Sequence, residues 1–78
     1  MSKLPQVSGK DTIKALQKIG FILNSQKWSH VKLVRIKNGQ RQTVIIPMHK
    51  NIKKGTLRNG ILKPINLRID EFINLLKK

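Results

Sequence analysis

The dipeptide Asn38-Gly39 lies between two segments, residues 29–37 and 40–46, that are rich in valine, isoleucine and threonine. Asn-Gly is a typical pair for a two-residue type I′ turn, because both central residues of that turn need positive φ. β-branched residues favour strands. The sequence therefore predicts a β-hairpin whose two strands run antiparallel on either side of this turn.

A helix and a short strand are predicted before the hairpin. Ser8 is a good N-cap, and Asp11 places a carboxylate in the first turn, where the helix dipole favours it. Gly20 is a natural stop for this helix. Residues 21–23 are apolar and predict a buried strand, and residues 24–27 predict a turn.

Two further helices are predicted after the hairpin. The first has Thr56 as its N-cap and ends at Pro64, because a proline inside a helix removes a hydrogen bond and clashes with the preceding turn. Residues 69–76 form a short final helix. We expect an α+β fold, α-β-β-β-α with an extra C-terminal helix, as a single domain over residues 1–78. Helices would pack on one face of a three-stranded antiparallel sheet and leave the other face open.

Charge is the strongest indication of function. The chain has 17 lysines and arginines against 3 aspartates and glutamates, a formal net charge of +14, which is typical of proteins that bind nucleic acid. Residues 12–69 contain no carboxylate. That stretch can supply neither a carboxylate-bound Mg²⁺ nor a pair of catalytic carboxylates. Chemistry on a phosphate would have to use histidine, lysine, arginine or the backbone.

The chain has 78 residues, no cysteine, and no apolar run that approaches the roughly 20 residues needed to span a bilayer. Its N-terminus lacks the apolar segment of a signal peptide. We therefore expect a cytoplasmic protein with no disulfide, no cofactor, no metal and no membrane partner.

Two histidines are candidates for acid–base chemistry, since histidine normally titrates near neutral pH. His30 begins the first hairpin strand and His49 follows the second, so the hairpin can bring both to one end of the sheet. Metal-free RNA cleavage needs a base for the 2′-hydroxyl, an acid for the leaving oxygen and cations for the phosphate. On these residues alone, each histidine is also compatible with an ordinary surface position, and a zinc site would lack further ligands nearby.

Aromatic and basic side chains near the histidines are candidates for RNA binding. Trp28 is either a core residue or, if exposed, a surface on which bases stack. Ser29 either orients His30 or is a plain turn residue. The basic run after the hairpin leads into a helix N-terminus, which favours phosphate, or is a solvated loop. The candidates for RNA binding are Lys27, Trp28, Lys32, Lys50, Lys53, Lys54 and Arg58.

Four motifs follow one another along the chain. They are a first helix ending in Lys-Ile-Gly-Phe, the Ser29-His30 pair that opens a strand, the segment Val-Ile-Ile-Pro-Met-His-Lys and the helix start Lys-Lys-Gly-Thr-Leu-Arg. From Ser8 to Leu76, their order and spacing resemble the HicA (YcfA-like) toxin family. The resemblance implies a double-stranded-RNA-binding-domain-like fold, which agrees with the predicted order of elements.

The resemblance also implies an activity and a partner. HicA toxins act as mRNA interferases, which are endoribonucleases that cut mRNA. They are neutralised by a HicB antitoxin, and the resemblance implies that any contact of the pair with DNA would be made by this antitoxin. The family's catalytic histidine, in its Gly-Ser-His motif, falls on His30, with Ser29 and His49 as candidate catalytic support. The motif's glycine is replaced here by Trp28, which changes the surface that RNA would approach.

Other functions share some of these features. A non-catalytic RNA-binding module would have the same charge and fold, and an acidic protein partner would also suit the stretch that lacks carboxylates. A function in reading DNA directly has less support from the sequence. No predicted helix is both basic and placed, beside a partner helix, like the recognition helix of a helix-turn-helix motif. The effect of His30→Ala on cleavage separates the nuclease from the binding module.

Overall fold

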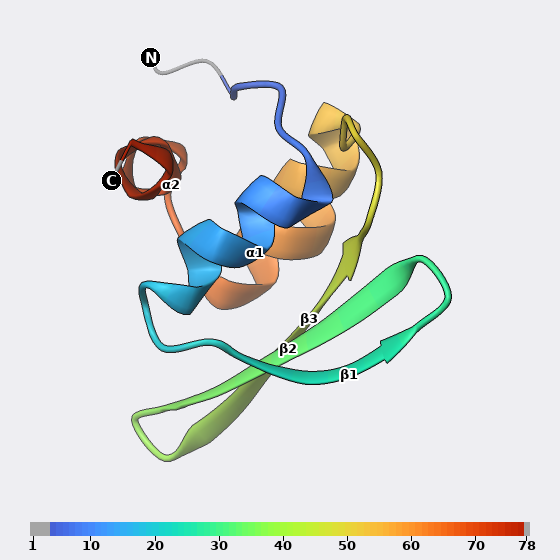
Figure 1. The fold of residues 1–78 in the computed structure, drawn as a ribbon. Coiled ribbons are helices and arrows are strands. Elements are labelled where there is room, and N and C mark those ends of the chain that lie inside the picture. The colour runs from blue at the N-terminus through green and yellow to red at the C-terminus, as the bar shows by residue number, and fades with distance from the viewer. Residues whose placement is uncertain (1–3, 78) are drawn as a thin grey trace.

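The computed structural model describes residues 4–77; residues 1–3 and 78 of the predicted domain lie outside the described range. Figure 1 shows a helix, three strands and then further helices. The elements are α1 (Gly9–Gln17), β1 (Ile22–Lys27), β2 (His30–Lys37), β3 (Gln40–Pro47), the π-helix η1 (Thr56–Leu62), the 3₁₀ turn η2 (Lys63–Ile65) and α2 (Ile69–Leu76). The predicted α+β class and the α-β-β-β-α order with an extra C-terminal helix are confirmed.

The three strands form one antiparallel sheet in the order β1-β2-β3. Asn38 and Gly39 have φ of +53° and +76°, as a type I′ turn requires, so the predicted hairpin is confirmed. From this turn the β2–β3 ladder runs without interruption to the pair formed by His30 and Pro47. The register therefore places His30 at the end of the sheet opposite the Asn38-Gly39 turn.

β1 is longer than the sequence predicts, and the expectation that it is buried is wrong, because every residue from Ile22 to Lys27 is exposed on this edge strand. The turn expected over residues 24–27 is wrong, because the strand continues to Lys27 and the chain reverses at Trp28-Ser29. The register shifts between Leu23 and Ser25, where one extra residue is accommodated as a bulge. Residues 24–27 have little strand preference of their own, but pairing with β2 satisfies their backbone groups.

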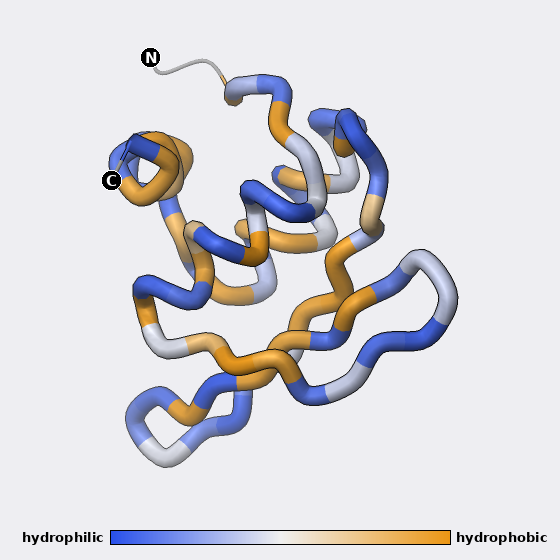
Figure 2. The backbone as a smooth tube through the Cα atoms, in the orientation of Figure 1, coloured by the Kyte–Doolittle hydropathy of each residue, from blue (hydrophilic) through white to orange (hydrophobic). Residues whose placement is uncertain are grey.

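The core lies between the sheet and the helices. Its sheet side consists of two buried cross-strand pairs, Val31 with Ile46 and Leu33 with Val44. Three fully buried side chains cover this face from α1 and η1: Leu16, Leu57 and Ile61. Phe72 of α2 is also fully buried in the same core cluster. Figure 2 shows that the middle of the sheet, beside the helices, is apolar, whereas hydrophilic residues flank its two turns. No described helix covers the other face of the sheet (Figure 1).

α1 begins and ends as predicted. The Ser8 Oγ accepts a hydrogen bond from the Asp11 N–H at 3.0 Å. At the other end Gly20 has φ of +100°, and the Phe21 N–H donates to the Leu16 carbonyl oxygen at 3.2 Å, as in a Schellman motif. These local contacts determine where the chain enters and leaves the helix.

The helix after the hairpin differs from the prediction at both ends. Thr56 is the first residue of η1 and not its N-cap, and Gly55 precedes it without a side-chain cap. Pro64 does not end the helix: the chain changes there from a π-helix to a 3₁₀ turn, and it stops at Asn66, whose φ of +55° is left-handed. Because proline has no N–H, it cannot donate the backbone hydrogen bond that would continue the helix. The more tightly wound 3₁₀ turn accommodates this missing bond, and Ile65 stays buried.

Candidate active site

His30 and His49 lie at the same end of the sheet. His30 begins β2 and pairs with Pro47, the last residue of β3, and His49 follows two residues later. Both residues are exposed, and both line one open hollow of about 480 Å³. The rest of its wall is formed by Ile45, Pro47, Asn51, Ile52, Lys53 and Thr56. The proximity of the two histidines that the hairpin predicts is therefore confirmed.

The segment that carries His49 is held by backbone hydrogen bonds at the start of α1. The His49 carbonyl oxygen accepts from the Gly9 N–H at 2.9 Å, and the Ile52 N–H donates to the Val7 carbonyl oxygen at 2.8 Å. Ile52 is also buried in the core. Residues 49–52 are thus fixed at both ends, although they lie outside any helix or strand.

Gly9 allows α1 to approach this segment closely. A Cβ at this position would collide with the Pro47 carbonyl oxygen and come within 3.0 Å of the Met48 Cα. A larger residue would therefore push the end of β3, and His49 with it, away from the helix. Gly9 is absent from the predicted site residues, and its place at the start of a helix gives no sign of this contact in the sequence.

The turn between β1 and β2 borders the histidine segment on another side. The Met48 N–H donates to the Ser29 carbonyl oxygen at 2.6 Å, so the turn and the segment are joined. Ser29 thus acts on the geometry through its backbone. Lys27 pairs directly with His30, and directly paired residues point to the same face of a sheet. The Lys27 side chain therefore shares a face with His30.

Trp28 lies on the surface of this turn. It is 86% exposed, so the alternative in which it belongs to the core is wrong. Its φ of +57° is in the left-handed region, at the position where the Gly-Ser-His motif has glycine. The Lys27 Nζ lies 5.3 Å from the centroid of the ring, within range of a cation–π contact. The turn therefore presents an aromatic ring and an ammonium group next to His30.

The predicted RNA-binding cations lie at different positions around the hollow. Lys53 is part of its wall. Lys32 is half-buried on β2, two residues from His30 and on the same face of the sheet. Three further predicted cations are exposed but do not line the hollow: Lys50, Lys54 and Arg58.

Two polar residues of the wall, Asn51 and Thr56, are absent from the predicted site. The sequence predicts a helix cap at Thr56 and no role for Asn51. Both lie in the basic run that follows β3, which is the one signal that points to them. Their amide and hydroxyl groups can donate hydrogen bonds to a phosphate.

One arginine of the sheet is engaged within the protein. The Arg35 Nε donates to the Gln42 Oε1 at 2.7 Å, and its Nη1 donates to the Ile19 carbonyl oxygen at 2.9 Å. The guanidinium also lies 4.7 Å from the centroid of the Phe21 ring. Burial lowers the pKa of Arg35 below its usual value. Arg35 therefore joins the end of α1 to the sheet, and it is not a candidate for RNA binding.

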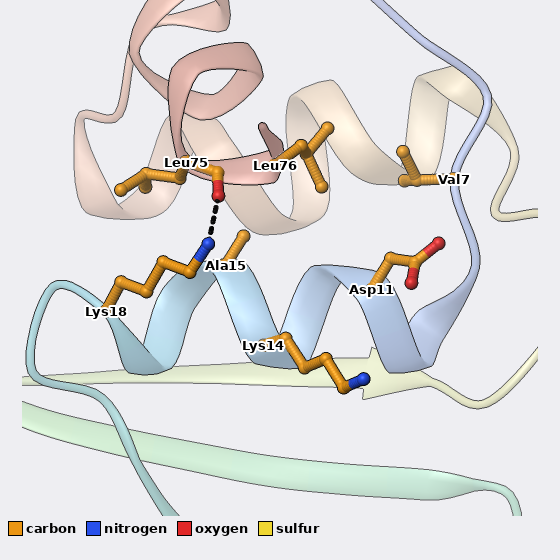
Figure 3. A pocket seen from close by; sticks show the side chains of 7 residues that line it. All are labelled: Val7, Asp11, Lys14, Ala15, Lys18, Leu75 and Leu76. Carbon is orange, nitrogen blue, oxygen red and sulfur yellow. Dashed lines mark hydrogen bonds between the residues drawn. The ribbon is translucent and has the colours of Figure 1, made fainter. Parts of the chain in front are cut away.

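A second hollow, of about 310 Å³, lies beside α1 and α2 (Figure 3). The Lys18 ammonium donates to the Leu75 carbonyl oxygen at 2.7 Å, near the C-terminal end of α2, where the helix dipole favours a cation. This contact joins the two helices. None of the predicted site residues lines this second hollow.

The described residues, 4–77, contain no group of three histidine, aspartate or glutamate side chains placed to hold a metal ion. In the same range, no helix has both the length and the apolar character needed to cross a membrane.

Residues 9–67 match the sequence model of a family described as HicA toxin of bacterial toxin-antitoxin. The match spans well over half of the chain. The chain belongs to the HicA toxin family. The resemblance that the motifs indicate is thereby confirmed. No curated protein and no solved structure matches the chain.

The matched region of this HicA toxin includes the whole candidate site. Both histidines, the Trp28 turn and Thr56 lie within it, whereas α2 begins beyond its last residue. The family is described as one of toxins from bacterial toxin–antitoxin systems.

Proposed function

We propose that this HicA toxin is a metal-independent endoribonuclease that cuts mRNA, an mRNA interferase, in which His30 is the catalytic base. The observation that carries the proposal is the open hollow lined by His30, His49 and Lys53 on a chain of net charge +14. A base, an acid and a cation around one phosphate are what RNA transesterification needs.

In the proposed reaction, His30 accepts the proton of a 2′-hydroxyl as that oxygen attacks the adjacent phosphorus. The bond between phosphorus and the 5′-oxygen breaks, and His49 donates a proton to this leaving oxygen. The backbone contact between Ser29 and Met48 supports the reaction by holding the two histidine-bearing segments together. The products are a 2′,3′-cyclic phosphate and a 5′-hydroxyl.

Cations hold the RNA strand and balance the charge that develops on phosphorus. Lys53 lines the hollow and Lys27 shares a sheet face with His30, so both are placed to contact the scissile phosphate. The remaining candidates bind phosphates to either side: Lys32, Lys50, Lys54 and Arg58. Contacts to phosphate carry no sequence preference by themselves.

The proposed protein partner is a HicB-type antitoxin with an acidic surface. Such a surface would complement the net charge of +14, and by covering the open hollow it would keep RNA away from both histidines. Any contact of the pair with DNA would come from the antitoxin.

Incubation with a long, mostly single-stranded RNA in EDTA, beside His30→Ala, tests the nuclease. We expect the wild type to cut and the variant not to cut, with 2′,3′-cyclic phosphate and 5′-hydroxyl ends. Fragments that carry a 5′-phosphate would contradict this chemistry. Ile36→Ala is a matched control, because Ile36 is 66% exposed on the same strand as His30 but near the opposite end of the sheet.

The second candidate function is a non-catalytic RNA-binding module. One observation favours it: Trp28 is 86% exposed with the Lys27 ammonium 5.3 Å from its ring centroid, and an aromatic ring beside a cation can hold a base and a phosphate without any catalytic group. A binding module would hold RNA in a salt-dependent way and would leave it intact in the assay above. His30→Ala would then bind RNA almost as well as the wild type.

A further inference from the structure

Trp28 has a backbone conformation that few large residues adopt. Within residues 4–77, the residues other than glycine with positive φ are Trp28, Asn38 and Asn66. Asparagine tolerates this region, because its short polar side chain can form local hydrogen bonds. A bulky residue there is a genuine outlier. The strain at Trp28 therefore needs a reason that the turn itself does not supply, since glycine would make the same turn without strain.

The folded structure gives no such reason. Trp28 is 86% exposed, more than any other large hydrophobic residue described, and it does not belong to the core cluster. The turn thus holds a strained backbone and leaves an apolar ring in water. Strained residues of this kind concentrate at binding and catalytic sites, where the strain serves function.

The neighbours of the ring indicate which ligand it fits. The Lys27 Nζ lies 5.3 Å from the ring centroid, and Lys27 is the direct cross-strand partner of His30. An aromatic ring, an ammonium group and an imidazole therefore follow one another at the same end of the sheet. A nucleotide offers a flat base for the ring and a phosphate for the ammonium, and stacking of bases on aromatic side chains is how proteins hold single strands.

We propose that Trp28 stacks on an unpaired base of the RNA strand whose neighbouring phosphate lies between Lys27 and His30. The substrate class is then RNA that is single-stranded at the cleavage site, because the bases inside a duplex have both faces covered by their neighbours. The cleavage part of this inference rests on the proposed function, whereas the stacking part is a statement about binding alone.

The single tryptophan of the chain gives a direct readout. In the His30→Ala background, which keeps RNA intact, we expect a short unstructured RNA to quench the fluorescence of Trp28. The same strand annealed to its complement should quench it far less. With a labelled RNA, Trp28→Gly should weaken single-strand binding by about 5- to 150-fold and duplex binding hardly at all, because one stacked base contributes that much to affinity.

Two variants separate stacking from folding and from general apolar contact. Trp28→Phe keeps an aromatic face and should retain most of the affinity. Ile36→Ala removes another exposed apolar side chain, 66% exposed near the far end of the sheet, and should bind as the wild type does. Trp28→Gly suits the left-handed turn, so a loss of binding cannot be ascribed to misfolding.

The outcomes for stacking and for catalysis can be told apart. If Trp28→Gly binds single strands as the wild type does, or loses single-strand and duplex binding equally, the stacking inference is wrong, and the ring serves another partner such as a protein. If His30→Ala still cuts RNA while the fluorescence of Trp28 is quenched, the stacking stands and the proposed catalytic role of His30 falls.

Discussion

The two histidines have separate roles in the proposed reaction, and the leaving group can distinguish them. When sulfur replaces the 5′-oxygen at one linkage, the leaving group departs without needing a proton. We expect His49→Ala to cut normal RNA on the order of 10²- to 10⁴-fold more slowly than the wild type, and the sulfur-containing RNA nearly as fast. His30→Ala should be slow on both substrates, because a base is needed in either case. Initial rates on the two RNAs measure this, and an equal loss for His49→Ala on both would show that His49 is not the acid.

Trp28→Gly should raise the free energy of unfolding. Left-handed backbone costs a residue other than glycine about 1–2 kcal/mol, and the freedom of glycine in the unfolded chain offsets about 0.5–1 kcal/mol of this gain. A net increase of roughly 0.5–1 kcal/mol is expected in urea unfolding followed by circular dichroism. Gly39→Ala is the converse control: φ is +76° with open space around it, so a loss of about 1 kcal/mol is expected. A marked loss of stability in Trp28→Gly would mean that the ring supports the fold.

The start of α1 and the end of β3 are packed backbone against backbone, and Gly9 makes this possible. In Gly9→Ala the new methyl group would overlap the Pro47 carbonyl oxygen, so one of the two segments must move. Because overpacking of this kind costs about 1–3 kcal/mol, the free energy of unfolding should fall by that amount. Cleavage should fall further than the loss of folded protein explains, since the hydrogen bond from Gly9 to His49 would also be disturbed. Parallel measurement of urea unfolding and cleavage rate checks both.

Gly60→Ala is the matched control for this prediction. Gly60 lies in η1 with open space around its position, and its φ is not left-handed. The same change of glycine to alanine should therefore stabilise the protein by about 0.5–1 kcal/mol and leave cleavage unchanged. If Gly9→Ala behaved like Gly60→Ala, the close approach of α1 to β3 would not position His49.

At the scale of elements, the sequence predicts what local contacts determine. The caps of α1 at Ser8 and Gly20 and the Asn38-Gly39 hairpin follow from residues a few positions apart, and the hairpin alone places His30 and His49 at one end of the sheet. Contacts between residues distant in sequence determine the other features. These are the extension of β1, the continuation of the helix through Pro64 and the close contact at Gly9. The exposure of Trp28 is of the same kind, because it depends on whether other segments pack against the turn.

At the scale of the whole molecule, none of the three side-chain carboxylates of the chain lines the candidate site. The three carboxylates lie at Asp11, in the first turn of α1, and at Asp70 and Glu71, in the first turn of α2. Asp70 is further paired with Arg68 at 3.3 Å. The hollow with the two histidines is therefore lined by basic and neutral side chains, which favours the approach of a polyanion.

This distribution predicts how RNA affinity depends on salt. Each phosphate held by a cation releases counterions, so a plot of log affinity against log salt concentration should steepen by about 0.7 per contact on a single strand. In the His30→Ala background, we expect Lys53→Ala to make the slope shallower by about 0.7. Lys37→Ala removes the same charge at the far end of the hairpin and should leave the slope unchanged. If both substitutions reduced the slope equally, RNA would be held by the overall charge and not at the hollow between His30 and His49.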